Sequence, residues 1–118
     1  MALTYLPITV TNPTNGKGKQ FTRRFLVDSG ATYSVMPAED LENLGIKPDA
    51  KQTFILANGQ QMVKPIGEAR FTYQEHQRTA PIVFGDKGVY LIGATTLEVM
   101  GLILDPINRK LKALPMMI

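Results

Sequence analysis

One carboxylate in this sequence lies in a setting that suits acid–base chemistry. Asp28 follows an apolar run at residues 25–27 and precedes a stretch of small residues, Ser29, Gly30, Ala31 and Thr32. Burying a carboxylate beside apolar residues is costly unless hydrogen bonds or a partner charge compensate for it. Asp28 is therefore a candidate catalytic acid or base. The same Asp-Ser-Gly pattern is also typical of an Asp that caps a turn by bonding to backbone N–H groups.

Other catalytic chemistries lack the residues that they need. The sequence has no cysteine and one histidine, His76, which falls in a polar stretch predicted to be a turn. A Ser-His-acid triad would depend on that histidine. A metal site would require several carboxylates, and the acidic residues are scattered along the chain. No glycine-rich phosphate-binding motif of the usual spacing occurs. We therefore expect neither a metal nor a cofactor.

Length and composition predict a single globular domain, residues 1–118, since 44% of the residues are hydrophobic and 19% are charged. The net charge is +3, and the basic cluster Lys17, Lys19, Arg23 and Arg24 lacks interleaved aromatic residues, so we expect no nucleic-acid partner. The first residues lack the features of a signal peptide. The longest apolar region, residues 89–104, contains an acid and two glycines, which argues against a membrane span. We expect a cytoplasmic protein.

The elements that position Asp28 are predicted to be mostly strands. Residues 3–10 and 20–27 show the β-branched and aromatic alternation of strands, and the Asn-, Gly- and Pro-rich residues 12–19 predict a loop between them. Asp28 stands at the end of the second strand. After the small-residue turn, residues 32–37 predict a short strand, and residues 37–46 predict a short helix.

The second half of the chain predicts another hairpin and a second short helix. Asn58-Gly59 lies between two apolar runs, which is the strongest short-range hairpin signal. A long strand, a turn at residues 74–78 and a returning strand at 79–85 follow. Residues 89–93 then predict a strand, residues 94–101 a short helix, and Ile107-Asn108 the turn of a last hairpin. The result is a mostly β domain of short strands with two short helices.

Three segments, in this order, resemble those of the retropepsin-like aspartic proteases, the class of the retroviral proteases and their small bacterial relatives. The segments are LVDSGAT, an acid-bearing loop; FILANGQQM, in the place of a flap hairpin; and YLIGATTLEVMGLILD, a glycine turn, helix and strand. The resemblance implies a mostly β, closed, barrel-like acid protease fold with a flap hairpin and one or two short helices.

The resemblance also implies an aspartic endopeptidase that hydrolyses extended peptides. In this class two Asp side chains share one proton, because two adjacent carboxylates cannot both ionise cheaply. The ionised acid activates a water, and the protonated acid polarises the scissile carbonyl. This sequence has one Asp-Ser-Gly, and we interpret Asp86 and Asp105 as turn or strand-end acids. The second Asp28 would then come from another copy, so the resemblance implies a homodimer that acts on a peptide or an unfolded protein.

The loop residues receive roles from the same resemblance. Ser29 would hydrogen-bond across the two-fold axis, and Thr32 would brace the loop. Gly30 would let backbone and substrate approach closely, since no side chain intervenes.

Two further segments complete the implied site. The flap would fold over a peptide bound in β-like fashion, and it comprises Leu56, Ala57, Asn58 and Gly59. The second glycine element consists of Leu91, Ile92 and Gly93. Four apolar residues would line a substrate pocket or belong to the core: Leu26, Val83, Phe84 and Ile92.

The sequence also departs from the retroviral pattern and leaves alternatives open. Ala94 follows Gly93 where retroviral enzymes usually carry an arginine, so an ion pair that braces their dimer is absent. The apolar chain end, with Leu114, Met116, Met117 and Ile118, would join a dimer sheet or pack on its own domain. One alternative is a catalytically silent module of the same fold that binds peptides or proteins, as a monomer or a non-productive dimer. Another is a structural β domain in which the Asp-Ser-Gly turn occurs by chance.

Overall fold

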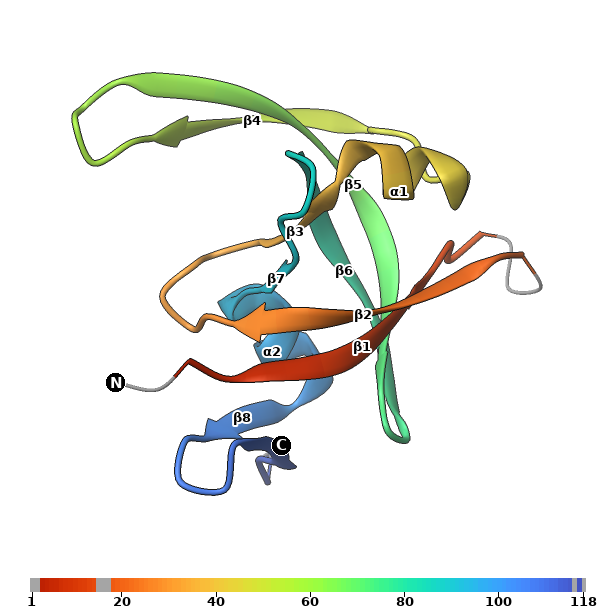
Figure 1. The fold of residues 1–118 in the computed structure, drawn as a ribbon, viewed down its shortest axis with the longest axis vertical. Helices are drawn as coiled ribbons and strands as arrows, with labels where there is room; N and C mark the ends of the chain where they lie inside the picture. Colours follow the sequence, from red (N-terminus) through yellow and green to blue (C-terminus); the bar gives the residue numbers. More distant parts are fainter. Residues whose placement is uncertain (1–2, 15–17, 116, 118) are drawn as a thin grey trace.

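The structure, a computed structural model, describes residues 3–14, 18–115 and 117. Lys17 of the basic cluster, and Met116 and Ile118 of the apolar chain end, lie outside the described residues. Strands dominate the chain, as Figure 1 shows. They are β1 (Tyr5–Thr11), β2 (Gln20–Val27), β3 (Ser34–Pro37), β4 (Ala50–Ile55), β5 (Gln61–Tyr73), β6 (His76–Gly85), β7 (Leu91–Ile92), β8 (Leu102–Asp105) and β9 (Lys110–Ala113). The helices are α1 (Ala38–Asn43) and α2 (Ala94–Met100).

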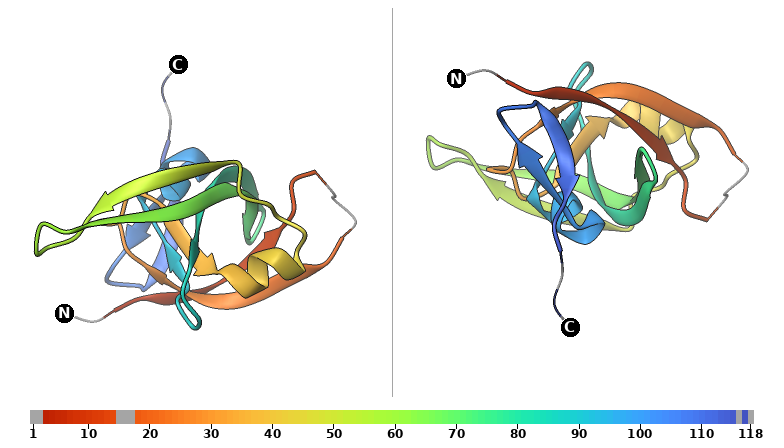
Figure 2. Two further views of the ribbon diagram at one scale, coloured as in Figure 1. Left: turned by 90° about the horizontal axis from the view of Figure 1, so that it is seen from above. Right: turned by 90° about the horizontal axis from the view of Figure 1, so that it is seen from below.

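Seven strands form one sheet, in the order β1-β2-β7-β3-β6-β5-β4, and a further pairing of β1 with β5 closes the sheet on itself. In that closing pair Thr9 lies opposite Thr72, and Thr11 lies opposite Arg70. The two views in Figure 2 show the strands wrapping around a common interior. β5 is 13 residues long, so it belongs to the ring at one end and forms the β4–β5 hairpin at the other. The predicted closed, mostly β fold with short helices is confirmed.

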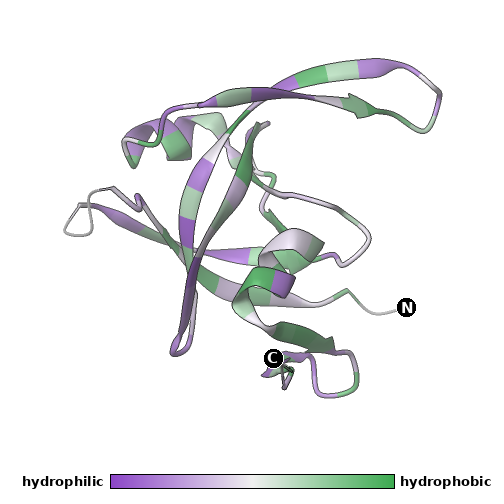
Figure 3. Ribbon diagram, turned by 180° about the vertical axis from the view of Figure 1, so that it is seen from behind, coloured by the Kyte–Doolittle hydropathy of each residue, from purple (hydrophilic) through white to green (hydrophobic). Residues whose placement is uncertain are grey.

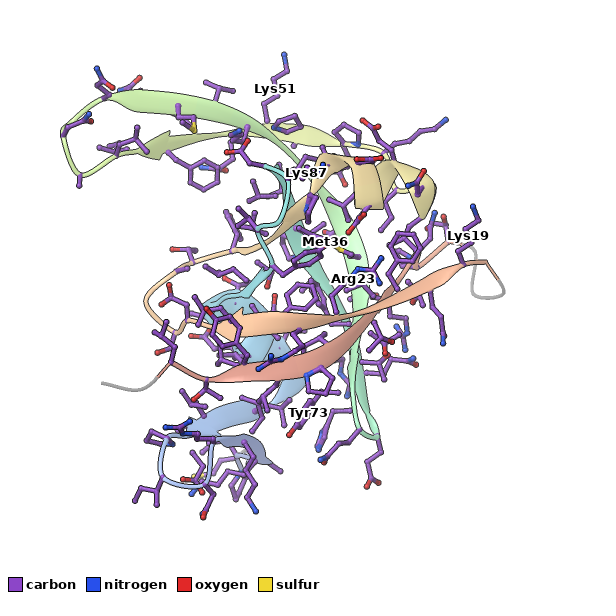
Figure 4. All side chains as sticks on the ribbon, viewed as in Figure 1. Lys19, Arg23, Met36, Lys51, Tyr73 and Lys87 are labelled. Carbon is purple, nitrogen blue, oxygen red and sulfur yellow. The ribbon has the colours of Figure 1, made fainter. Side chains whose placement is uncertain are left out.

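The core fills the inside of this ring because side chains alternate between the two faces of a strand. In β1, Ile8 and Val10 are fully buried, and the residues between and beside them are partly exposed. Met36 of β3 points into the same interior, as Figure 4 shows, and is also fully buried. Each such side chain contributes about 1.5–3 kcal/mol by leaving water. The ring is therefore a filled scaffold.

Two parallel strands bring distant segments to one edge of the ring. β2 and β7 pair in parallel, with Leu26 opposite Leu91 and Val27 opposite Ile92. The residues that follow them, Asp28 and Gly93, therefore emerge side by side although they lie far apart in the sequence. β3 runs antiparallel to β7 and parallel to β6, and so holds this edge from the other side.

The short helices begin and end close to the predicted positions. α1 follows Pro37, and Gly45 takes a left-handed conformation with φ of 76° beyond its end. α2 begins after Gly93 and ends at Gly101, whose φ is 67°. The predicted turn at residues 74–78 is too long: Tyr73 already pairs with His76, and β6 begins there. Neither helix, within the described ranges, is long and apolar enough to span a bilayer.

β8 and β9 form a separate two-stranded sheet. Figure 3 shows that β8 is strongly hydrophobic although it lies at the periphery of the molecule. One of its side chains, Ile103, is 43% exposed, and Leu114, just after β9, is 50% exposed. This hairpin therefore presents apolar surface on the outside of the molecule.

Candidate active site

Asp28 lies at the end of β2 in a turn that its own carboxylate helps to build. Its N–H donates to the carbonyl of Ile92 at 3.0 Å, which continues the β2–β7 pairing by one residue. Its Oδ1 accepts the N–H of Gly30 at 2.9 Å, and the N–H of Ala31 donates to its carbonyl at 3.2 Å. The side chain is half-buried. The carboxylate is thus held in one orientation by its own loop, and in the described residues no ion pair neutralises it.

The acid loop, residues 28–33, is fastened to the second glycine element. The N–H of Ala94 donates to the carbonyl of Ala31 at 2.7 Å, and the N–H of Thr95 donates to the carbonyl of Thr32 at 3.0 Å. A Cβ on Gly93 would lie 2.7 Å from the carbonyl oxygen of Tyr33 and 2.8 Å from that of Ala31. Only glycine allows this approach. The structure thus brings together two segments that the sequence analysis singled out separately.

Two hydroxyls that the sequence analysis missed complete this attachment. Ser34 and Thr96 form a buried hydroxyl–hydroxyl bond of 2.6 Å, and both residues are fully buried. The Ser34 hydroxyl also accepts the N–H of Gly93 at 3.0 Å. A polar residue at an inward position of an apolar pattern is the signal that could have identified Ser34, because buried polar groups need partners.

A second polar contact is made by Tyr90, the residue just before β7. The Tyr90 hydroxyl donates to Asp40 of α1, and Arg23 Nε lies 3.8 Å from the same carboxylate oxygen. Figure 4 shows Arg23 reaching from β2 toward α1. Burial, and then the hydrogen bond to Asp40, raise the pKa of Tyr90 above its ordinary value. The phenol therefore stays protonated as a donor, and it connects α1 to the strand that precedes Gly93.

The β4–β5 hairpin and the acid loop project on the same side of the molecule, as Figure 1 shows. Between them lies a groove of about 490 Å³, which we call the hairpin groove. Its apolar wall includes Tyr33, Val35, Phe54, Met62 and Val89. The rings of Tyr33 and Phe54 meet edge to face at 6.3 Å, so the hairpin touches the acid loop directly.

The predicted flap residues lie at the end of this hairpin. Leu56 lines the hairpin groove, whereas Ala57, Asn58 and Gly59 make the exposed turn at the tip. Gly59 takes a φ of 84°, and Asn58 Oδ1 accepts the N–H of Gln60 at 2.9 Å. The Asn-Gly turn signal therefore predicted this hairpin correctly.

Val83 is the one residue, of the four expected to line a pocket or belong to the core, that lines the hairpin groove. Phe84 and Ile92 are buried in the core, and Leu26 is half-buried in β2 opposite Leu91. Gly30, Ala31 and Thr32 also line the groove.

A second hollow lies on the other side of the acid loop. It is lined by Ser29, by Ala94 and Leu97 of α2, by Ile103 of β8 and by Leu114 just after β9. We call it the α2 hollow. Its wall is mostly apolar, and it borders the residue directly after Asp28. Within the described residues, no group of three potential metal-binding side chains occurs.

The closed β ring, the acid loop attached to a glycine turn and the adjoining hairpin groove define the retropepsin-like class of fold. A profile of the family described as aspartyl protease matches residues 8–96, which is more than half of the chain. The chain therefore belongs to the aspartyl protease family, a family of peptidases, and the predicted resemblance is confirmed.

Solved structures agree on the fold. The solution structure of simian foamy virus (mac) protease matches with a TM-score of 0.57 and 18% sequence identity, over 80% of this chain and 91% of that chain. At this identity the likeness concerns the fold alone. No curated protein matches the chain.

Proposed function

We propose that this protein is an aspartic endopeptidase that works as a homodimer, with Asp28 from each of two copies acting on one water. The observation that carries the proposal is a half site: Asp28 on a firmly attached loop beside an open groove, in a chain of the aspartyl protease family. The Asp-Ser-Gly loop occurs once in the sequence, so one chain supplies one such carboxylate. A second copy supplies the other.

The chemistry follows from placing two equal carboxylates together. Ionising both would be costly, so the pair holds one proton. The ionised Asp28 takes a proton from a water, and the protonated Asp28 of the other copy donates a hydrogen bond to the scissile carbonyl, which the water attacks. The tetrahedral intermediate then collapses: the C–N bond breaks, and the proton taken from the water passes to the leaving amine nitrogen. Gly30, directly beside the carboxylate, leaves room for the peptide backbone. No cofactor takes part in these steps.

The α2 hollow supports the pairing of two copies. A two-fold axis that brings both Asp28 residues together passes beside Ser29, which lines this hollow. Ile103 and Leu114, which line this hollow, are 43% and 50% exposed. A second copy would cover this apolar surface, and Ser29 would bond across the axis. We also propose that residues 1–118 form a single domain.

The β4–β5 hairpin would act as the flap. Its tip residues, from Leu56 to Gly59, extend beyond the ring, and the walls of the hairpin groove include residues of strands β3, β4, β5 and β6. An extended peptide in that groove can bond to backbone groups in β-like fashion, and its side chains can enter the apolar wall. Extended peptides and unfolded proteins are therefore the expected substrates.

A cleavage assay tests the chemistry. We expect the wild-type chain to cleave quenched fluorescent peptides in the acidic to neutral range, and Asp28→Asn to lose at least about 100-fold in rate, because it removes the acid–base group. Asp49→Asn, an exposed acid outside the hairpin groove, is the matched control and should keep the wild-type rate. Equal rates for the wild type and Asp28→Asn would refute the assignment.

A mixing experiment tests the shared site. At a ten-fold excess of Asp28→Asn over wild type, random pairing leaves most wild-type subunits in mixed dimers, so activity should fall roughly ten-fold. An Asp28→Asn chain that also carries Leu114→Glu should fail to pair and should not inhibit. An activity independent of added Asp28→Asn would exclude a dyad shared between copies. Peptide binding by a clean monomer that cleaves at no pH would instead support a silent binding module.

A further inference from the structure

The hairpin groove contains one charged pair in an otherwise mostly apolar wall. Among its described lining residues, Lys64 of β5 and Asp86 of the β6–β7 turn are the charged ones. Lys64 Nζ lies 3.4 Å from Asp86 Oδ1. The pair therefore joins the proposed flap strand β5 to the turn that follows the neighbouring strand β6.

The two partners differ in how much water they reach. The Lys64 side chain is 28% exposed, whereas that of Asp86 is 84% exposed. The aliphatic part of a lysine packs well on apolar surface while its ammonium keeps its hydration at the edge. An ammonium has three N–H donors, and here one of them is directed at Asp86. Lys64 can therefore accept a second anionic partner without giving up the first.

The charges around this edge favour an anion. Lys87 follows Asp86 in the same exposed turn, so the edge carries two cations and one anion. A peptide lying in the groove would displace water from the less exposed Lys64, which strengthens its attraction to a nearby carboxylate. A basic side chain would meet Lys64 and would have to compete with it for Asp86.

We propose that Lys64 is a specificity-determining residue that binds an acidic side chain of the substrate, next to the apolar side chain that fills the hairpin groove. The inference rests on the proposed function in taking this groove as the peptide site. It goes further by naming the substrate class: extended peptides with a large apolar residue and a nearby Asp or Glu. In an extended chain, residues two positions apart share one face, so that spacing suits both contacts.

The test uses peptides with one fixed apolar residue and with Glu, Gln or Lys placed in turn at each neighbouring position. Binding is measured by fluorescence anisotropy with the Asp28→Asn chain, and cleavage is measured with the chain that retains Asp28. At one position we expect Glu to be favoured over Gln about three- to ten-fold, and Lys to be disfavoured, with a preference that shrinks as salt rises.

The variants decide which residue is responsible. Lys64→Met should abolish the preference, and Lys64→Glu should reverse it toward Lys. Lys51→Met is the matched control: Lys51 lies on the neighbouring strand β4 and points away from the rest of the molecule, as Figure 4 shows, so the preference should persist. Asp86→Asn should keep or increase the preference for Glu. If Asp86 were the binding group instead, Lys would be favoured and Asp86→Asn would remove that preference.

The outcomes separate this inference from the proposed function. A Glu preference in binding without cleavage supports Lys64 as the binding residue and refutes the protease proposal. Cleavage with equal rates for Glu, Gln and Lys at every position overturns the inference and leaves the protease proposal standing. If the chain neither binds nor cleaves any of the peptides, both are overturned.

Discussion

The buried hydroxyl pair behind the acid loop gives a prediction whose magnitude follows from the structure. Ser34→Ala removes the oxygen that accepts the Gly93 N–H and pairs with Thr96. The Gly93 N–H and the Thr96 hydroxyl would both lose this partner, and because both groups are buried, water would not replace it. A buried polar group left without a partner costs about 1–3 kcal/mol, and we therefore expect Ser34→Ala to lower the free energy of unfolding by roughly 2–4 kcal/mol.

Thr96→Val keeps the shape of the side chain but removes its hydroxyl. Ser34 would still accept the Gly93 N–H, so the cost should be smaller, about 1–2 kcal/mol. The two changes share one contact, and the double variant should therefore lose less than the sum of the single variants, by on the order of 1 kcal/mol.

The chain provides a matched control for this hydroxyl pair. Thr9 and Thr22 also form a hydroxyl–hydroxyl bond, of 2.7 Å, but they do so on the exposed face of β1 and β2. Water can replace that contact, so Thr9→Val should change the stability by less than about 0.5 kcal/mol. Urea unfolding at several protein concentrations measures the stability of the four variants against the wild type. The dependence on concentration separates folding from any association. If Ser34→Ala cost no more than Thr9→Val, the account of how the acid loop is held would be wrong.

Two further predictions concern the same framework. Gly93→Ala should destabilise the chain by about 1–3 kcal/mol, since its Cβ would meet the carbonyl oxygens of Tyr33 and Ala31; a urea midpoint equal to that of the wild type would contradict this. Partial desolvation of its carboxyl, and then the neighbouring Asp49, raise the pKa of Glu68 above its usual 4.5. Its contribution to stability is therefore full below about 4.5 and is lost as the pH rises through the folded-state pKa. Glu68→Gln should then stabilise the chain at neutral pH, by less than about 0.5 kcal/mol because the side chain is exposed. The gain should vanish in urea titrations near pH 4, and an equal gain at both pH values would count against the assigned cause.

The local features of this fold could be predicted from the sequence because each has a local cause. Alternation of apolar residues predicted β1 and β2, and Asn58-Gly59 predicted the tip of the β4–β5 hairpin. Small residues after Asp28 predicted a turn there. The length of the β5–β6 turn was overestimated, because Gln74 takes a φ of 53°, a left-handed conformation that its residue type does not announce.

The long-range contacts could not be predicted in the same way. The parallel pairing of β2 with β7 joins segments more than sixty residues apart, and no local pattern encodes which strands will be neighbours. The resemblance picked out Gly93, and an inward polar position marks Ser34. Neither signal says which groups these residues and Thr96 contact when the acid loop lies against α2. The position of Lys64 in the hairpin groove is another long-range feature. Its strand was predicted, but its place in the groove depends on the turn that carries Asp86.

The internal attachment of the acid loop bears directly on how a shared site could work. Backbone bonds from Ala94 and Thr95, and the hydroxyls of Ser34 and Thr96, fix the loop within one chain, before any partner arrives. In the proposed dimer two carboxylates would act on one water, so both would have to be held in precise positions. A loop that became ordered only on association would lower the dimer affinity by its ordering entropy. A loop that is already ordered removes that cost from association. A modest apolar contact at the α2 hollow would then be enough to pair two copies, even with Ala94 where retroviral enzymes have a bracing arginine.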